Sequence, residues 1–280
     1  MPLQKLAVEI ENLWFKYPET KNWTLKNIDL KIKEGELIAL VGENGAGKTT
    51  LIKHLIGLLK PQKGTVKIYG KNTRNHTVAE LARIIGIIFQ NPDHQLFSET
   101  VEKEIEFTLK NFGYTKQQIK SIVQKVLKEF NLDKQADKSP LELSQGERKR
   151  LTIAFTVAYN PQIIVLDEPT IGQDYKSKQQ IAQIVKQLNK KGKTVIIVTH
   201  DIKFALQHIP ETIVMSKGKI IARGPTWKVL TEDKIVKQAK LTKPLIVRIY
   251  ERIKDKIGGE KQLNYNRIEQ QILEAINNAY

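Results

Sequence analysis

Residues 37–50 read Leu-Ile-Ala-Leu-Val-Gly-Glu-Asn-Gly-Ala-Gly-Lys-Thr-Thr, and this stretch decides the fold. The apolar run at its start predicts a buried strand, and the GxxxxGKT pattern after it has the spacing of a phosphate-binding loop. Glycines at positions 42, 45 and 47 allow backbone conformations that other residues avoid, so successive N–H groups can surround phosphate oxygens. Apolar residues follow at helical spacing up to Leu59, so the loop opens a helix whose positive dipole end faces the phosphates. A nucleoside triphosphate is therefore the expected ligand.

We expect the whole loop to bind the nucleotide, through Gly42, Glu43, Asn44, Gly45, Ala46, Gly47, Lys48, Thr49 and Thr50. Lys48 supplies a point charge to the phosphates, which also makes it a catalytic candidate, and Thr49 is placed to hold magnesium. A glycine-rich turn without a ligand is the alternative, but the strand before the loop and the helix after it favour nucleotide binding.

Length and composition describe an ordinary globular protein. The 280 residues contain no apolar run long enough to span a membrane and no signal-peptide core, so we expect a cytosolic protein. The absence of cysteine excludes disulfides, thiolate metal sites and a cysteine nucleophile. The net charge of +16 invites a nucleic-acid interpretation, yet the lysines are scattered among glutamates, without a basic tail. A solvated surface is favoured, and attraction to the anionic cytoplasmic face of a membrane is a third possibility.

The order of apolar patterns predicts an α/β chain with a small antiparallel sheet. Short β-like runs occupy residues 6–13, 28–32 and 65–69, and we expect them to flank the strand that carries the loop. From residue 98 to residue 159 the pattern is helical, with Thr115 as an expected N-cap.

Two later apolar runs predict strands of a parallel sheet, and the chain then becomes helical. Residues 163–166 and 194–198 are continuously apolar, as in strands buried on both faces, and a helix over residues 177–189 joins them. After about residue 234, two apolar stripes at helical spacing predict a helical C-terminal extension. The stripes are Ile246, Ile249, Tyr250, Ile253 and Ile257, then Ile268, Ile272, Leu273 and Ile276.

Polar residues follow both of these strands. Asp167 suits a ligand to magnesium, and Glu168 would orient and deprotonate the attacking water. The alternative, a strand that ends in acidic turn residues, is disfavoured because phosphoryl transfer requires both a metal holder and a group that positions the water. His200 follows the next strand at the edge where ligands bind, and either a structural role or a contact with the γ-phosphate is open.

Ser144 and Glu147 have the spacing of a capping box, which explains both residues structurally. The functional alternative is that this helix end addresses a nucleotide, with Ser144 as a ligand and Gly146 allowing close approach of a phosphate. Because Ser144 lies in the helical region, a separate subdomain is expected to carry it.

In order and spacing, these motifs together resemble the nucleotide-binding domains of ATP-binding cassette (ABC) proteins. The motifs are residues 42–49, Gln90, residues 143–147, residues 163–168 and His200, and the resemblance covers residues 6–225. It implies a P-loop NTPase core of the ABC type, with an antiparallel β subdomain and a helical signature subdomain at about 92–160. The ABC ATPase domain would then span residues 1–234, and residues 235–280 would be a helical extension that either packs on its own chain or contributes to dimerisation. ATP and Mg²⁺ are the implied ligands.

The resemblance also implies roles for single residues. The signature residues Ser144, Gln145, Gly146 and Glu147 would address the ATP of a partner subunit, which requires a head-to-tail dimer. Tyr17 would stack on adenine, with a plain strand-end aromatic before Pro18 as the alternative. Gln90 would sense the γ-phosphate, join Thr49 and Asp167 at the metal, and contact a membrane partner, while Asp174 would bridge the two sites. Gln145 and Glu147 depart from the usual Leu-Ser-Gly-Gly-Gln signature, whereas Ser144 and Gly146 keep to it.

A narrower resemblance points to the ATPase subunits of energy-coupling factor (ECF) transporters. It rests on residues 90–97, residues 168–174 and residues 241–244 before the helical tail. It implies an ATPase that powers uptake of a vitamin or a transition-metal ion, on the cytoplasmic face of the cell membrane as a peripheral protein. The implied partners are a second ABC ATPase, a transmembrane coupling protein and a substrate-binding membrane protein.

Two other functions stay open at this point. One is the ATPase of another ABC importer or an exporter. The other is a soluble ABC protein that acts on nucleic acid or ribosomes, which the basic charge would suit. Against it, the chain has one cassette and no room between Lys48 and Ser144 for a long coiled coil, so we expect no nucleic-acid partner. Neither the solute nor the choice between homodimer and heterodimer follows from the motifs.

Overall fold

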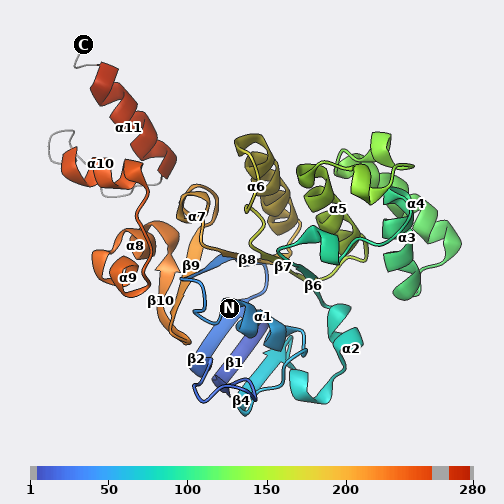
Figure 1. The fold of residues 1–280 in the computed structure, drawn as a ribbon, viewed down its shortest axis with the longest axis horizontal. Helices are drawn as coiled ribbons and strands as arrows, with labels where there is room; N and C mark the ends of the chain where they lie inside the picture. The colour runs from blue at the N-terminus through green and yellow to red at the C-terminus, as the bar shows by residue number, and fades with distance from the viewer. Residues whose placement is uncertain (1–4, 254–264, 278–280) are drawn as a thin grey trace.

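A computed structural model describes residues 5–253 and 265–277. Two sheets form its centre (Figure 1). The smaller sheet is antiparallel, with the strand order β2 (Leu25–Lys33), β1 (Leu6–Phe15), β4 (Lys63–Ile68) and β5 (Lys71–Asn72). The larger sheet has the order β10 (Lys219–Pro225), β9 (Glu211–Ser216), β3 (Leu37–Val41), β8 (Thr194–Thr199), β7 (Ile163–Asp167) and β6 (Ile85–Ile88). The predicted combination of an α/β core with an antiparallel sheet is thereby confirmed.

The larger sheet is parallel from β9 to β6, and both of its faces are covered. Alternate residues of β3 enter different cores, because successive side chains of a strand point to opposite faces. Leu37 and Val41 pack with α6 (Tyr175–Lys190) and α7 (Ile202–His208), whereas Ile38 packs with α1 (Lys48–Leu55) and the smaller sheet. Figure 1 shows these layers above and below the sheet. This burial on both faces explains the continuous apolar runs of the central strands.

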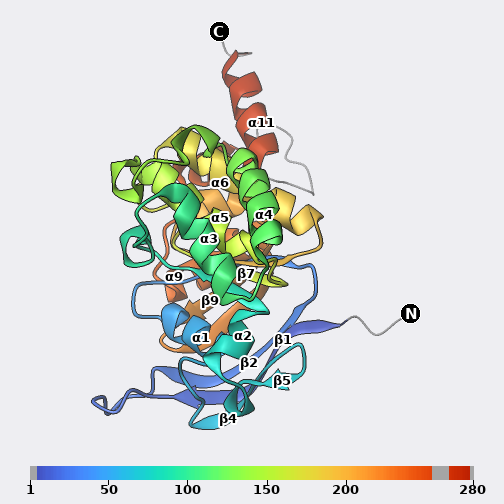
Figure 2. The ribbon, with the colours of Figure 1, turned by 90° about the vertical axis from the view of Figure 1, so that its right-hand side faces the viewer.

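A group of helices extends beyond the β6 edge of the sheet (Figure 1), and it faces the viewer in Figure 2. It contains α3 (Val101–Asn111), α4 (Lys116–Glu129) and α5 (Gln145–Ala158), and α2 (Val78–Ala82) lies beside its base. Thr115 caps α4 through a capping box, which confirms the predicted N-cap. The apolar stripe of α4 is buried against α3 and α5 in the main core. The three helices lie within the helical segment expected from the sequence.

The C-terminal part consists of α8 (Thr226–Thr231), α9 (Asp233–Gln238), α10 (Leu245–Ile253) and α11 (Tyr265–Asn277). Tyr250 and Ile268 form a small cluster with Trp227, Ile246 and Ile253, so part of the predicted stripe packs on its own chain. Exposed apolar side chains remain on these helices at Leu245, Ile249 and Leu273. Ile257 lies outside the described residues, as do the side chains of Ile272 and Ile276.

Several elements differ from the sequence-based expectation. The helix after the loop ends at Leu55 rather than Leu59, because Gly57 takes a left-handed conformation with φ +71°. Strands β5, β6, β9 and β10 were not predicted, and the boundary expected after residue 234 falls inside α9. Among the helices of the described part, none is long and apolar enough to cross a membrane.

Candidate nucleotide-binding site

The phosphate-binding loop joins β3 to α1, and two of its glycines are required by their surroundings. Gly47 precedes α1 with φ +102°, and a Cβ atom there would lie 2.9 Å from Leu25 Cδ2. A Cβ atom on Gly42 would lie 2.2 Å from the carbonyl oxygen of Met215. Larger residues at these positions would displace the loop, so the glycine pattern is a steric requirement of this backbone path.

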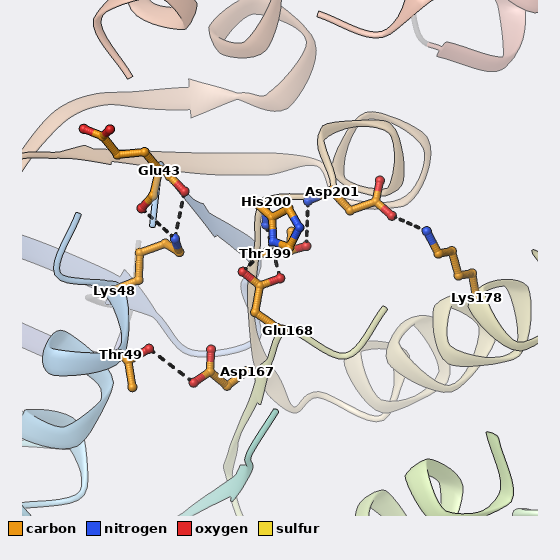
Figure 3. Close-up of polar contacts among 10 residues, drawn as sticks. Glu43, Lys48, Thr49, Asp167, Glu168, Lys178, Thr199, His200 and Asp201 are labelled. Carbon is orange, nitrogen blue, oxygen red and sulfur yellow. Dashed lines mark hydrogen bonds and ion pairs between the residues drawn. The ribbon is translucent and has the colours of Figure 1, made fainter. Parts of the chain in front are cut away.

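Lys48 is buried at the start of α1, and its side chain turns back onto the loop (Figure 3). Its ammonium donates to the carbonyl oxygens of Gly42, at 2.7 Å, and Glu43, at 3.1 Å. Burial lowers the pKa of Lys48, although the charges of Glu168, Asp167 and Glu43 oppose that shift. A buried cation next to backbone N–H groups is suited to bind an anion such as phosphate.

Asp167 is the last residue of β7, and its carboxylate reaches the start of α1. Strand β8 separates β7 from β3, yet the Thr49 hydroxyl lies 3.4 Å from Asp167 Oδ2, as the dashed line in Figure 3 shows. Burial raises the pKa of Asp167, and the neighbouring charge of Glu168 raises it further. A divalent cation beside these two carboxylates would relieve both effects, so the donor set fits magnesium.

Glu168 has an unusual backbone conformation that aims its side chain at the end of β8. Its φ is +48°, which is uncommon for a residue other than glycine, and its N–H donates to the Val198 carbonyl at 2.8 Å. Glu168 Oε1 lies 3.0 Å from His200 Nδ1, and Oε2 accepts from the His200 N–H at 3.3 Å. Such strain persists where the surroundings impose it, and it is common at functional sites. Glu168 and His200 therefore form one unit at the carboxyl edge of the sheet.

These residues surround one cavity of about 400 Å³. Its lining includes the predicted residues Asn44, Gly45, Gly47, Lys48, Thr49, Thr50, Gln90, Asp167, Glu168 and His200. The cavity is not lined by three other predicted residues of the loop, Gly42, Glu43 and Ala46. Tyr17 is also absent from the lining, but its hydroxyl lies 3.2 Å from Thr50 Oγ1. Thr24 and Ile171 also line the cavity. The sequence did not single them out as site residues, because Thr24 precedes β2 outside any motif, and Ile171 lies within residues 168–174, which served only for the narrower resemblance.

The signature residues lie elsewhere, around a second cavity of about 480 Å³ that also includes Asp174. Ser144 caps α5, where its Oγ accepts from the Glu147 N–H at 3.3 Å and the Glu147 carboxylate accepts from the Ser144 N–H at 2.9 Å. The predicted capping box is thus confirmed. Asp174 caps α6 by accepting from the Ser177 N–H at 2.7 Å. The two cavities share no lining residue.

Comparisons with known proteins agree with this geometry. A family model described as ABC transporter matches residues 25–171. A putative ABC transporter ATP-binding protein of Caldanaerobacter subterraneus subsp. tengcongensis is 42% identical over 229 residues, which are 82% of this chain but only 40% of that relative. The energy-coupling factor transporter ATP-binding protein EcfA of Methanocaldococcus jannaschii is 38% identical over 246 residues, 87% of this chain and 88% of the relative.

Among solved structures, that of cbiO1 from Clostridium perfringens, described as part of the ABC transporter complex cbiONQ, is similar to this chain. The two share 32% identity with a TM-score of 0.77, over 89% of this chain and 100% of the other. Fold, motifs and relatives agree with the resemblance seen in the sequence. The chain therefore belongs to the ABC transporter family, as an ATP-binding subunit similar to the energy-coupling factor ATPases.

Proposed function

We propose that this chain hydrolyses ATP in a head-to-tail dimer and thereby powers an ECF-type importer. We call the cavity around Lys48 the Lys48 cavity, and the cavity around Ser144 and Gly146 the signature cavity. The observation that carries the proposal is that these two cavities are separate. Within a single chain, no signature residue lines the Lys48 cavity, and no residue of the phosphate-binding loop lines the signature cavity. In a dimer with two-fold symmetry, the signature of each chain can face the phosphate-binding loop of the other, which creates two equal sites.

Each residue of the Lys48 cavity has a task in this reaction. Lys48 would exchange its two carbonyl partners for phosphate oxygens, and Tyr17 would support the adenine end beside Thr50. Thr49, Asp167 and Gln90 would hold magnesium, which when bound neutralises charge on the phosphates. Across the dimer, Ser144 would donate to the phosphates of the partner's nucleotide.

Glu168 would accept the proton of the attacking water. Its carboxylate is nearly buried and held by two contacts from His200, so it is oriented before substrate arrives. His200 is about half exposed and would contact the γ-phosphate from the same side of the cavity. Asp174, at the start of α6, would link the two sites across the dimer.

An apolar groove supports the assignment of a membrane partner. A cavity of about 370 Å³ lies between α2, α3 and α5, and its rim carries Phe97 and Phe107, which are 66% and 44% exposed. The two rings pack edge to face, with their centroids 4.8 Å apart. Exposed aromatic side chains beside a groove are typical of protein–protein contacts. Gln95 lines this groove and accepts from the Phe89 N–H at 3.0 Å, so the groove borders the segment that carries Gln90.

The relative named EcfA and the structure of cbiO1 support the wider assignment. We propose a peripheral position on the cytoplasmic face of the cell membrane, with a transmembrane coupling protein and a substrate-binding membrane protein as partners. Selection of the solute, a vitamin or a transition-metal ion, would belong to those membrane partners. Residues 235–280 would form an extension that holds two ATPase subunits together.

The substitution Glu168→Gln tests the catalytic assignment. The amide can hold water but cannot take its proton, so steady-state hydrolysis should vanish while ATP binding persists. Sedimentation should then show an ATP-dependent dimer that the wild-type chain forms only transiently. Glu129→Gln, which breaks a surface ion pair with Lys191, is the matched control and should behave as wild type. Near-normal turnover of the Glu168→Gln variant would contradict Glu168 as the base.

A further inference from the structure

The side chain of Lys149 joins two segments that the proposed reaction must move together. Lys149 lies in the second turn of α5, the helix that Ser144 caps, and it is only 3% exposed. Its ammonium donates to the carbonyl oxygens of Phe89, at 3.0 Å, and Gln90, at 3.1 Å. The segment that follows β6 and presents Gln90 to the nucleotide cavity is therefore bonded directly to the signature helix.

A buried ammonium is costly, and this one is compensated mainly by neutral carbonyl groups. Burial lowers the pKa of Lys149 to about 8, which the charge of Asp167 partly opposes. A buried charge needs well-formed hydrogen bonds, and an apolar residue of similar volume is often as stable. The two bonds hold the backbone at Phe89 and Gln90 against α5. Loss of the ammonium would leave both carbonyls without this donor, which is unfavourable for buried groups.

The neighbouring residue Arg148 holds the far end of the same segment. Its guanidinium pairs with Asp93 at 2.8 Å and donates to the Leu143 carbonyl at 3.1 Å. Two successive residues of α5 thus bind positions 89, 90 and 93, on either side of the turn at Asn91–Pro92. A displacement of α5 must displace Gln90 unless these bonds break.

We propose that Lys149 is a positioning residue that fixes Gln90 to the signature helix. Docking of Ser144 on the partner's ATP and placement of Gln90 at the chain's own ATP then form one movement. This inference rests on the proposed head-to-tail dimer, and it adds a link between the two nucleotides through a single buried side chain. Lys149 itself touches neither substrate nor metal.

The substitution Lys149→Met keeps the length and apolar stem of the side chain but removes the donor. In the nucleotide-free chain, hydrogen exchange of residues 89–95 should accelerate, because the segment loses its bonds to α5. In steady-state hydrolysis, kcat should fall roughly 100-fold while KM changes little, since the nucleotide site stays intact but Gln90 is misplaced. Lys149→Arg retains donors for the two carbonyls and should recover much of kcat.

Lys193→Met is the matched control. Lys193 is also a buried lysine bonded to a backbone carbonyl, that of Asn160 at 3.3 Å, but it precedes β8 at the opposite edge of the sheet. It should change neither the exchange of residues 89–95 nor kcat. Unchanged exchange in Lys149→Met would overturn the proposal, as would accelerated exchange with unchanged kcat. Absence of turnover in the wild-type chain, both alone and mixed with a related ATPase, would instead refute the proposed function, while the exchange experiment would still report on Lys149.

Discussion

Substitution of Ser144 separates two roles of one hydroxyl, the cap that the structure shows and the trans contact that we propose. Within the chain, Ser144 caps α5 through the reciprocal bonds with Glu147. In the proposed dimer, the same exposed hydroxyl contacts the partner's ATP. A change that removes the hydroxyl therefore affects both stability and hydrolysis, and the two effects have different magnitudes.

The stability effect follows from capping energetics. Replacing an N-cap serine by alanine costs about 1 kcal/mol, whereas glycine costs only a few tenths. For a chain of this size, about 1 kcal/mol lowers the melting temperature by roughly 2–4 °C. Ser144→Ala should therefore melt measurably lower than wild type in a nucleotide-free thermal scan, and Ser144→Gly should melt close to wild type.

The effect on hydrolysis should not follow that order. Both variants lose a donor to the partner's phosphates, so kcat should fall on the order of 100-fold in each. ATP affinity of the isolated monomer should be unchanged, because Ser144 does not line the Lys48 cavity. Calorimetric titration and a steady-state phosphate-release assay measure the two quantities. Full hydrolysis in both variants at 25 °C would show that Ser144 is only a cap and would refute the trans contact.

Three further predictions address the other surfaces. Lys48→Ala should weaken ATP binding to the monomer roughly 10- to 100-fold in calorimetric titration, since a phosphate loses a charge-assisted partner; unchanged affinity would contradict the loop assignment. Phe97→Asp should leave hydrolysis by the purified chain intact and abolish co-purification with a coupling membrane protein, and retained co-purification would exclude the apolar groove as its docking surface. Removal of residues 242–280, or the surface changes Leu245→Ser with Leu273→Ser, should weaken nucleotide-free association in sedimentation without altering ATP affinity; equal association, alone and with a related ATPase, would show that the extension is not the tether.

The sequence alone determined the features that depend on neighbouring residues. The β3 strand, the glycine loop and the start of α1 are consecutive, so their local chemistry specifies one conformation with little help from the rest of the chain. The capping boxes at Thr115 and Ser144 are local for the same reason, because each closes within three residues. The order of these motifs along the chain was then sufficient to identify the family.

Only the tertiary structure decided which distant groups meet. The insertion of β8 between β3 and β7 and the place of Thr24 in the cavity each depend on packing between segments far apart in the chain. The meeting of Thr49 with Asp167 was expected, but only from the resemblance to a family and not from local chemistry. Lys149 is the clearest example of a contact that the sequence could not reveal. In the sequence it is one lysine in a basic helix, and no pattern marks it as buried. Its partners are backbone carbonyls, which every residue carries, so residue type could not reveal the contact. Only packing brought the Lys149 ammonium to the segment that carries Gln90, and these bonds join that segment to the helix that Ser144 caps.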